Sequence, residues 1–381
     1  MSEHAAFIDA VQRNCHIADA RHAGDLPLCS YLLQMREFCR WSIGQAPGRP
    51  LPRETVGAWL TEREALWDGL EDEPLQPLAF EGRLHDPFDT ASLNAALAPH
   101  GLLYGAGLVG PGRPVFFVGE RLEAGWLDAA SDESTAEPAR PAPPSDTADP
   151  PLRLLVAGTE FARTLLAPPA ALSPGDEDGP TIVLRLQSLQ RWLWEGFEAW
   201  SLRRSPGPYA RLMALLGVHD ETGFARAVPR LTASVRAMLV LHEVGEARCG
   251  RALGPRWSAM RNAMRDDRLA DARLRALRDG LADCSVTLPR LLDHGDAAAL
   301  HFWFAHYDGL REAQCPELPR AYEAWCAGDG GAALSQHCAR LAAGLWREAE
   351  GLMAAHQAGG EAAFAEVARR LAQVVVRTSV P

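Results

Sequence analysis

The sequence predicts a mainly α-helical protein, with a helical C-terminal domain and a small N-terminal α+β part that contains a β-hairpin. Three observations support this prediction. Apolar residues recur at helical spacing over most of the chain. Two β-rich runs flank Gly110-Pro111-Gly112, which is a typical hairpin signal. Between the two parts, residues 128–151 are rich in Pro, Ser, Ala and Asp and poor in large apolar residues.

The N-terminal part, residues 1–127, is predicted to begin with helices. Residues 1–45 carry two apolar stripes at helical spacing, interrupted by glycine and proline, and residues 53–69 predict a further helix. The segment GAGLVGPG, residues 105–112, contains a GxG but no glycine that opens a following helix. We therefore expect it to supply the turn of the hairpin rather than a phosphate-binding loop.

Residues 128–151 are predicted to form a disordered linker, because so few apolar side chains cannot offset the entropy cost of ordering the segment. The second domain, residues 152–381, is predicted to be mostly helical, with a short strand at Ile182–Leu184 before its first helix. Its helices are expected near residues 186–204, 208–217, 222–251, 255–265, 268–290, 297–311, 316–327, 331–357 and 361–377.

Charge and composition exclude several classes of function. The chain of 381 residues has 49 acidic and 38 basic residues, which gives a formal net charge of -11. This balance argues against a general nucleic-acid binder, which needs a strong basic field. All of the basic residues in that count are arginine. The absence of lysine excludes a P-loop lysine and Schiff-base chemistry.

The 8 cysteines are scattered and form no CxxC pair, which argues against a zinc ribbon or a thioredoxin-type site. The sequence starts without a basic segment followed by an apolar one, and it contains no run of about 18 uncharged apolar residues. We therefore expect a cytoplasmic protein with free thiols and no membrane partner. The oligomeric state stays open.

The strongest chemical signal is the segment LHEVGEARCG, residues 241–250. His242 and Glu246 are four residues apart and share one helix face, a spacing that suits two ligands of one divalent ion. Glu243 projects about 100° further around the helix. In H-E-x-x-H metallohydrolases the glutamate at this position is the general base for a water on the metal, which makes Glu243 the candidate catalytic residue.

A second segment, LRDGLADCSVTLP, places Asp279 and Asp283 on one helix face in the same way. Together the two segments resemble the zincin-like metallohydrolases of the dipeptidyl-peptidase III type. The resemblance implies that His242, Glu246 and Asp279 are metal ligands. It also implies that Glu243 is the base and that Asp283 is a second-shell carboxylate that orients a histidine.

Two positions depart from the pattern of that family. Glu246 stands where the family has histidine, and Asp279 stands where it has glutamate. A carboxylate can still ligate zinc, so the expected cofactor is a divalent metal with zinc as the default ion. The shorter Asp279 must approach closely to reach a metal–oxygen distance of about 2.0–2.2 Å.

Two other groups of residues are candidates for a role near this site. His301 could face the helix of His242 as an additional ligand, as a residue that supports the ligands or as a proton shuttle, the alternative being a core histidine bonded to a carbonyl. Near the N-terminus, Cys15, Asp19 and His22 share a helix face and could bind a metal. The alternative for this segment is an ordinary helix with solvated or capping charges.

The sequence thus predicts a divalent-metal-dependent hydrolase that acts on a small-molecule or peptide substrate. One alternative is a non-hydrolytic helical metalloenzyme that holds iron, although the E-x-x-H signature of di-iron bundles is missing. Another is a helical interaction or regulatory protein without catalysis. The N-terminal string CHIADARHAGDLPLCSYLLQMREFCRW resembles an uncharacterised bacterial family, and that resemblance implies no activity.

Overall fold

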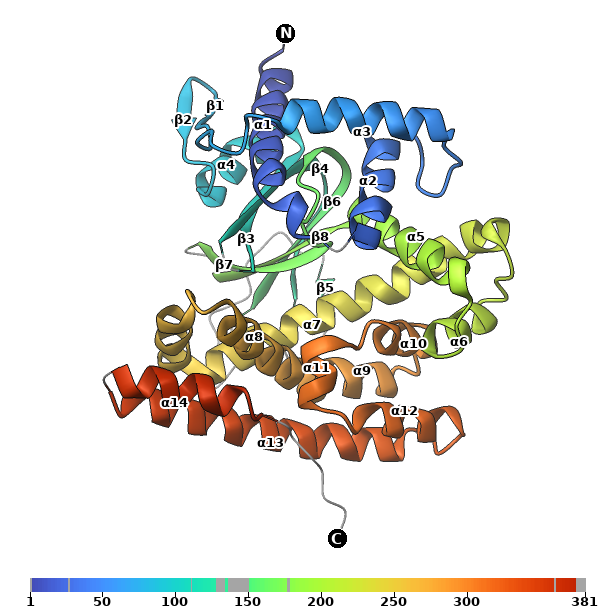
Figure 1. Cartoon of the computed structure of the whole chain (residues 1–381), viewed down its shortest axis with the longest axis vertical. Coiled ribbons are helices and arrows are strands. Elements are labelled where there is room, and N and C mark those ends of the chain that lie inside the picture. Colours follow the sequence, from blue (N-terminus) through green and yellow to red (C-terminus); the bar gives the residue numbers. More distant parts are fainter. Residues whose placement is uncertain are drawn as a thin grey trace. The chain divides into compact units, whose positions relative to one another are not determined.

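The computed structural model describes residues 2–26, 28–110, 112–127, 134–135, 151–176, 179–359 and 361–374. The fold is mainly helical, with an α+β part and a β-hairpin toward the N-terminus, as predicted (Figure 1). By its internal contacts the chain divides into two units. The first comprises Met1–Ser205 and His219–Thr232, and the second comprises Pro206–Val218 and Ala233–Pro381.

The first unit contains a mixed six-stranded sheet among the residues described, in the order β3-β4-β6-β8-β7, with β5 paired to β4. Neighbouring strands are antiparallel, except for the parallel pair β6 and β8. The strands are β3 (Leu102–Val109), β4 (Arg113–Leu127), β5 (Ser134–Thr135), β6 (Leu152–Arg163), β7 (Ala170–Asp176) and β8 (Gly179–Arg185); β1 (Leu78–Phe80) and β2 (Arg83–His85) pair separately.

The predicted hairpin is the pair β3 and β4. Gly110 and Gly112 have φ angles of 61° and 73°, a backbone conformation that glycine adopts without steric cost. Each face of the sheet carries a buried apolar cluster. On one face, Phe7 and Val11 of helix α1 (Glu3–His22) pack in a cluster with Tyr104 of β3. The other face has its own cluster of Leu103, Phe117, Leu155 and Ala157.

The prediction that the chain is mostly helical from residue 152 onward is wrong for residues 152–181. They form β6, β7 and the start of β8, and β6 pairs with β4 along Leu127↔Leu152 through Phe117↔Arg163. Strand β6 is buried at nearly every position rather than at alternate ones, and its central residues 154–158 form an apolar run, which periodicity does not separate from a helix. The strands from residue 152 to 185 belong to the first unit.

The predicted linker, residues 128–151, lies outside the described residues except for the two residues of β5 and residue 151. The helices of the first unit occur close to where helical spacing predicts them, apart from α4, which was missed. Asp89 caps α4 by accepting a hydrogen bond from the Ser92 N–H. These helices are α1 (Glu3–His22), η1 (Ala23–Asp25), α2 (Leu28–Ser42), α3 (Arg53–Trp67), α4 (Thr90–Leu97), η2 (Ala98–His100) and α5 (Leu186–Arg203).

The second unit consists of helices wherever it is described. Helix α7 (Glu221–Met264) begins among residues assigned to the first unit, and it is broken at Gly254, whose φ is 70°. Helix α13 (Ala332–Gln357) packs against α8 (Arg268–Ala282), α9 (Leu288–Asp293), α12 (Leu318–Cys326) and α14 (Glu361–Leu371) (Figure 1). The other helices are α6 (Pro208–Leu215), the π-helical η3 (Asp283–Thr287), α10 (Ala297–Ala305) and α11 (Gly309–Gln314).

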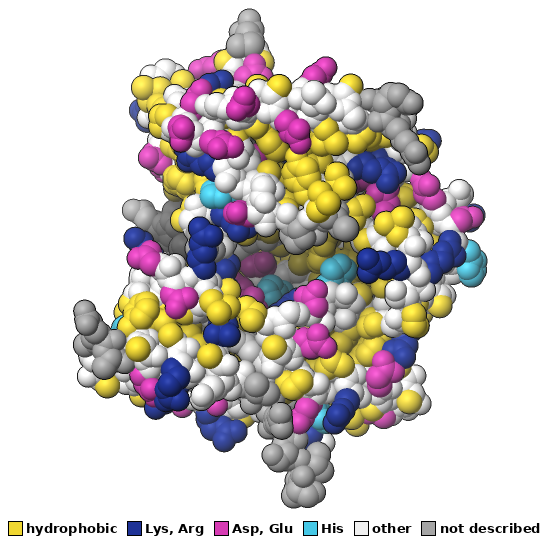
Figure 2. All heavy atoms as spheres, viewed as in Figure 1, with side chains coloured by type: hydrophobic (Ala, Val, Ile, Leu, Met, Phe, Trp, Pro, Cys, Tyr) yellow, Lys and Arg dark blue, Asp and Glu magenta, His cyan; other side chains and the backbone are white. Residues whose placement is uncertain are grey.

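Charged side chains of both signs are interspersed over the visible face of the molecule, without an extended basic field (Figure 2). This distribution agrees with the acidic balance of the chain. Among the described residues, none of the helices combines the length and the apolar character needed to cross a bilayer.

Candidate metal site

Two helices of the second unit bring the four sequence-predicted polar residues together. His242 and Glu246 lie one turn apart on α7, and Asp279 lies on α8, one turn before Asp283 at the start of η3. Each pair shares a helix face because a separation of four residues is close to one full turn. Asp279 and Asp283 therefore lie close to His242 and Glu246, as the predicted site requires.

Gly245 allows α7 and α8 to approach each other at this level. A Cβ atom at Gly245 would lie 2.9 Å from the backbone oxygen of Ala282 and 3.0 Å from its Cβ. Any larger residue would therefore push against the backbone of α8. The glycine in the HEVGE segment has a packing role that holds the facing side chains within reach of one another.

His242 uses its two ring nitrogens for different partners. Nδ1 lies 2.8 Å from Asp283 Oδ1, so Nδ1 donates a hydrogen bond to this buried carboxylate. Nε2 lies on the other side, 3.6 Å from Glu246 Oε1. Burial by itself would lower the pKa of His242, but the negative charges and hydrogen bonds of Asp283 and Glu246 raise it well above its usual range.

His242, Glu246 and Asp279 form a possible ligand set for a cation. One donor atom from each lies within 4.8 Å of the other two, and among the described residues this is the group with such geometry. Their side chains are partly exposed, at 22%, 12% and 28% respectively. The cluster is therefore accessible to a small ion, and it combines one imidazole nitrogen with two carboxylate oxygens.

Arg278 is part of this cluster, and the sequence analysis missed it. Its Nη2 donates to Glu246 Oε1 at 2.6 Å and lies 3.4 Å from Asp279 Oδ1. Burial would raise the pKa of Glu246, but the hydrogen bond to His242 and the charge of Arg278 lower it to about 2. Arg278 precedes Asp279 in sequence, so a search for basic residues beside the predicted ligands would have found it.

Asp279 and Glu243 both have a raised pKa. Burial and the neighbouring charge of Glu246 raise the pKa of Asp279 to about 7. Glu243 is 6% exposed, and its burial raises the pKa to about 7 although the charge of His242 opposes this. Glu243, which follows the candidate ligand His242 in sequence, can therefore gain or lose a proton near neutral pH.

Asp283 is held ionised although it is only 1% exposed. Burial would raise its pKa, but the charge of His242, the charge of Arg311 and a hydrogen bond from Trp303 lower it. Arg311 Nη1 lies 3.6 Å from Asp283 Oδ2. Neither Arg311 nor Trp303 carried a signal in the sequence analysis, because both reach the site only through the packing of separate helices.

His301 does not join this cluster. It lies on α10, where its Nδ1 is 2.8 Å from the Tyr322 hydroxyl and its ring is 5.2 Å from that of Trp325. Burial and the charge of Arg211 lower its pKa. The structure thus supports the alternative of a core histidine, with a tyrosine hydroxyl in place of the expected carbonyl.

The N-terminal candidates Cys15, Asp19 and His22 have separate partners. Cys15 is buried and its thiol lies 3.6 Å from a backbone carbonyl oxygen. Asp19 accepts a hydrogen bond from the Leu165 N–H at 2.9 Å, whereas His22 faces Asp25 across 3.7 Å. These side chains tie α1 to its surroundings, and within the described residues they form no cation-binding group.

Two family models match most of the chain. The N-terminal domain of a family of unknown function (DUF6866) matches residues 6–138, and the C-terminal domain of the same family matches residues 190–374. No curated protein and no solved structure matches the chain. The chain therefore belongs to the DUF6866 family, whose function is unknown, in agreement with the predicted membership of an uncharacterised family.

Proposed function

We propose that the second unit is a divalent-metal-dependent hydrolase of the zincin-like type, with His242, Glu246 and Asp279 as the ligands. The observation that carries the proposal is that the two ring nitrogens of His242 have different partners. Nδ1 donates a hydrogen bond to Asp283, while Nε2 faces Glu246. Metal-binding histidines regularly donate their second ring N–H to a carboxylate, which fixes the tautomer and the ring orientation.

The donor set fits a small divalent cation. One imidazole nitrogen and two carboxylate oxygens converge within 4.8 Å, and a protein site with three ligands leaves a position open for water or substrate. Arg278 donates to Glu246 at 2.6 Å, so a cation must compete with this guanidinium for the carboxylate. We expect this competition to weaken metal affinity, and replacing Arg278 with Gln to strengthen it.

When bound, a divalent cation supplies a Lewis acid that makes a water molecule acidic near neutral pH. Glu243 would be the group that accepts a proton there, since it follows His242 in sequence and burial raises the pKa of its carboxylate to about 7. Asp283 keeps the imidazole of His242 oriented through the 2.8 Å hydrogen bond. The substrate class stays a small molecule or a peptide.

Metal binding and hydrolysis can be tested separately. Purified full-length protein is first analysed for bound elements and titrated with Zn²⁺ and Mn²⁺ by calorimetry. His242→Ala should abolish binding of the cation, whereas His337→Ala, a control on α13, should leave it unchanged. Asp283→Asn should weaken the affinity about 10–100-fold, because it removes the carboxylate that orients His242.

Glu243→Gln distinguishes a base from a ligand. This variant should keep the affinity for the cation while it loses a factor of about 10²–10⁴ in hydrolysis of peptide, ester or phosphoester substrates. Equal loss of metal in Glu243→Gln and His242→Ala would make Glu243 a ligand or a structural residue. Absence of any metal affinity in the wild type would refute the metal site and favour an interaction protein with a polar network. A metal-loaded protein without hydrolytic activity would refute the hydrolase.

A further inference from the structure

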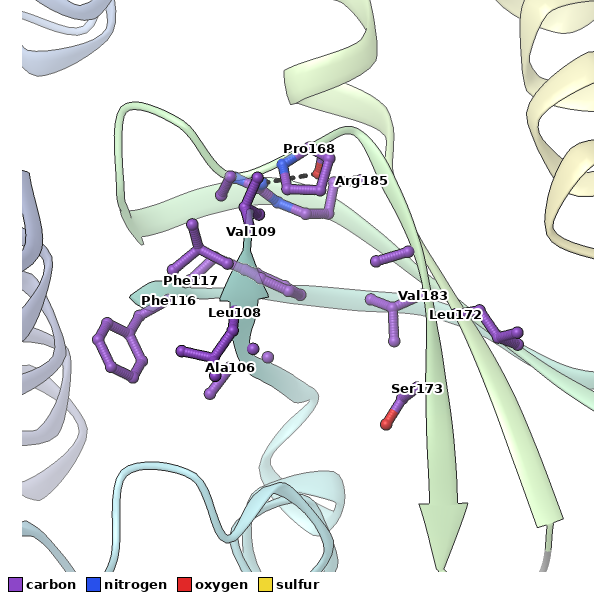
Figure 3. Close-up of a pocket in the computed structure, with 15 residues that line it drawn as sticks. Ala106, Leu108, Val109, Phe116, Phe117, Pro168, Leu172, Ser173, Val183 and Arg185 are labelled. Atoms are coloured by element: carbon purple, nitrogen blue, oxygen red, sulfur yellow. Dashed lines mark hydrogen bonds between the residues drawn. The ribbon is translucent and has the colours of Figure 1, made fainter. Parts of the chain in front are cut away.

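The sheet of the first unit contains an apolar pocket that is separate from the candidate metal site. Its volume is about 300 Å³, at the lower end of the range of about 300–1,000 Å³ that is typical of small-molecule sites. Strands β3, β4, β7 and β8 supply its walls (Figure 3). The lining includes Leu108, Val109, Phe117, Leu172 and Val183.

One glycine of the GAGLVGPG segment shapes this pocket. An added Cβ at Gly105 would lie 2.1 Å from the ring of Phe117, so only glycine leaves room for this ring against β3. Gly107 also lines the pocket, and an added Cβ there would meet no atom within 4 Å. The space beside Gly107 is therefore open, and the predicted hairpin segment contributes a cavity wall as well as a turn.

Arg185 is the charged residue that lines the pocket, and its side chain is almost completely buried. Its guanidinium carbon lies 4.6 Å from the centre of the Phe117 ring, and its Nη1 donates to the Pro168 carbonyl at 3.0 Å (Figure 3). Nη2 donates to Glu160 Oε2 at 3.0 Å. The Nε–H group is buried and has no acceptor. Because this atom has almost no accessible surface, Arg185 acts on the pocket through its positive charge rather than through the Nε–H group.

The charges around Arg185 favour an anionic ligand. Glu160 is 3% exposed and is surrounded by Arg163, Arg185 and Arg191, each at most 5% exposed. These arginines lower the pKa of Glu160 although its burial opposes this. A single carboxylate thus balances three buried guanidinium groups. Burial raises the pKa of the nearby Glu195 to about 7, so this residue offsets the surplus only in part at neutral pH.

We propose that this pocket binds a medium-chain carboxylate, with the carboxylate end toward the Arg185 side chain and the hydrocarbon chain against Phe117, Leu172 and Val183. At about 30 Å³ for each water-sized group, 300 Å³ holds about ten such groups, which matches a chain of about eight carbons with its carboxylate. Arg185 is the single basic residue in the lining, which suits a monoanion better than a phosphate. This proposal is independent of the metal site.

The test compares ligands that differ in charge or in chain length. Calorimetry on the full chain uses octanoate, the neutral octanol, the short acetate and inorganic phosphate. We expect one saturable octanoate site per chain. Octanol and acetate should each bind at least ten-fold more weakly, because one lacks the charge and the other lacks the chain. Equal affinity for octanol, tighter binding of phosphate, or no octanoate binding would overturn the proposal.

Gly107→Leu tests the location of this site without changing Arg185. The new side chain fills the pocket from β3 without a clash at Cβ, so the variant should fold and should lose at least ten-fold in octanoate affinity. Gly57→Leu is the matched control, because Gly57 lies on α3 outside the lining and an added Cβ there also meets no atom within 4 Å. Unchanged octanoate binding by folded Gly107→Leu would place the ligand elsewhere and refute the proposal.

Discussion

Replacing Gly245 with alanine should destabilise the protein, although alanine normally stabilises a helix. Helix propensity alone favours alanine over glycine by about 0.5–1 kcal/mol. At Gly245, however, the new methyl group meets the Ala282 oxygen at 2.9 Å, its Cβ at 3.0 Å and its Cα at 3.1 Å. These atoms belong to the backbone and to a short side chain, so the helices themselves must separate.

Overpacking of a close contact typically costs about 1–3 kcal/mol, which exceeds the gain in helix propensity. Gly250 on the same helix provides the matched control, since an added Cβ there meets no atom within 4 Å. We expect Gly250→Ala to be stabilised by about 0.5–1 kcal/mol. The free energy of unfolding of Gly245→Ala should lie about 1–3 kcal/mol below that of Gly250→Ala.

Urea-induced unfolding followed by circular dichroism measures both variants under the same conditions. The separation of α7 from α8 should also lengthen the 2.8 Å hydrogen bond between His242 and Asp283, which an NMR titration of the imidazole detects. Equal free energies of unfolding for the two alanine variants would refute the reasoning. In that case Gly245 would not set the distance between these helices.

Two further predictions concern buried polar residues of α1. Burial raises the pKa of Asp19 to about 8, despite the hydrogen bond from the Leu165 N–H. Asp19 is therefore protonated in the folded state at pH values where it is ionised in the unfolded chain, and its contribution to stability falls between about pH 4 and 8. Asp19→Asn should gain stability over the wild type across this interval, by up to about 1.4 kcal/mol per pH unit, and denaturation at pH 5 and pH 8 checks this. Asn14 forms hydrogen bonds of 2.8 Å and 2.7 Å to the backbone oxygen and nitrogen of Gln76. Asn14→Ala should lower the midpoint of unfolding by the equivalent of about 1–3 kcal/mol, and a midpoint equal to that of the wild type would show that these bonds contribute nothing net.

The helices and the hairpin were predictable because their signals are local. Helical spacing located most helices of the second unit, and the gap predicted between the helices at 222–251 and 255–265 corresponds to the break at Gly254 in α7. The hairpin followed from the glycines between two β-rich runs. Strands β6 and β7 were missed, since a strand buried on both faces does not alternate and its partner β4 lies far away in the sequence.

In the candidate site, too, some features were predictable from local spacing and others depended on tertiary packing. Spacing by itself determined that His242 shares a face with Glu246, and that Asp279 shares one with Asp283, because the helical repeat relates residues four apart. Only the tertiary structure decided which nitrogen of His242 meets Asp283, that Arg278 neutralises Glu246, and that His301 lies elsewhere. Such contacts depend on how closely two helices pack and at what level. That distance is decided by small features such as a missing Cβ, which no periodicity reveals.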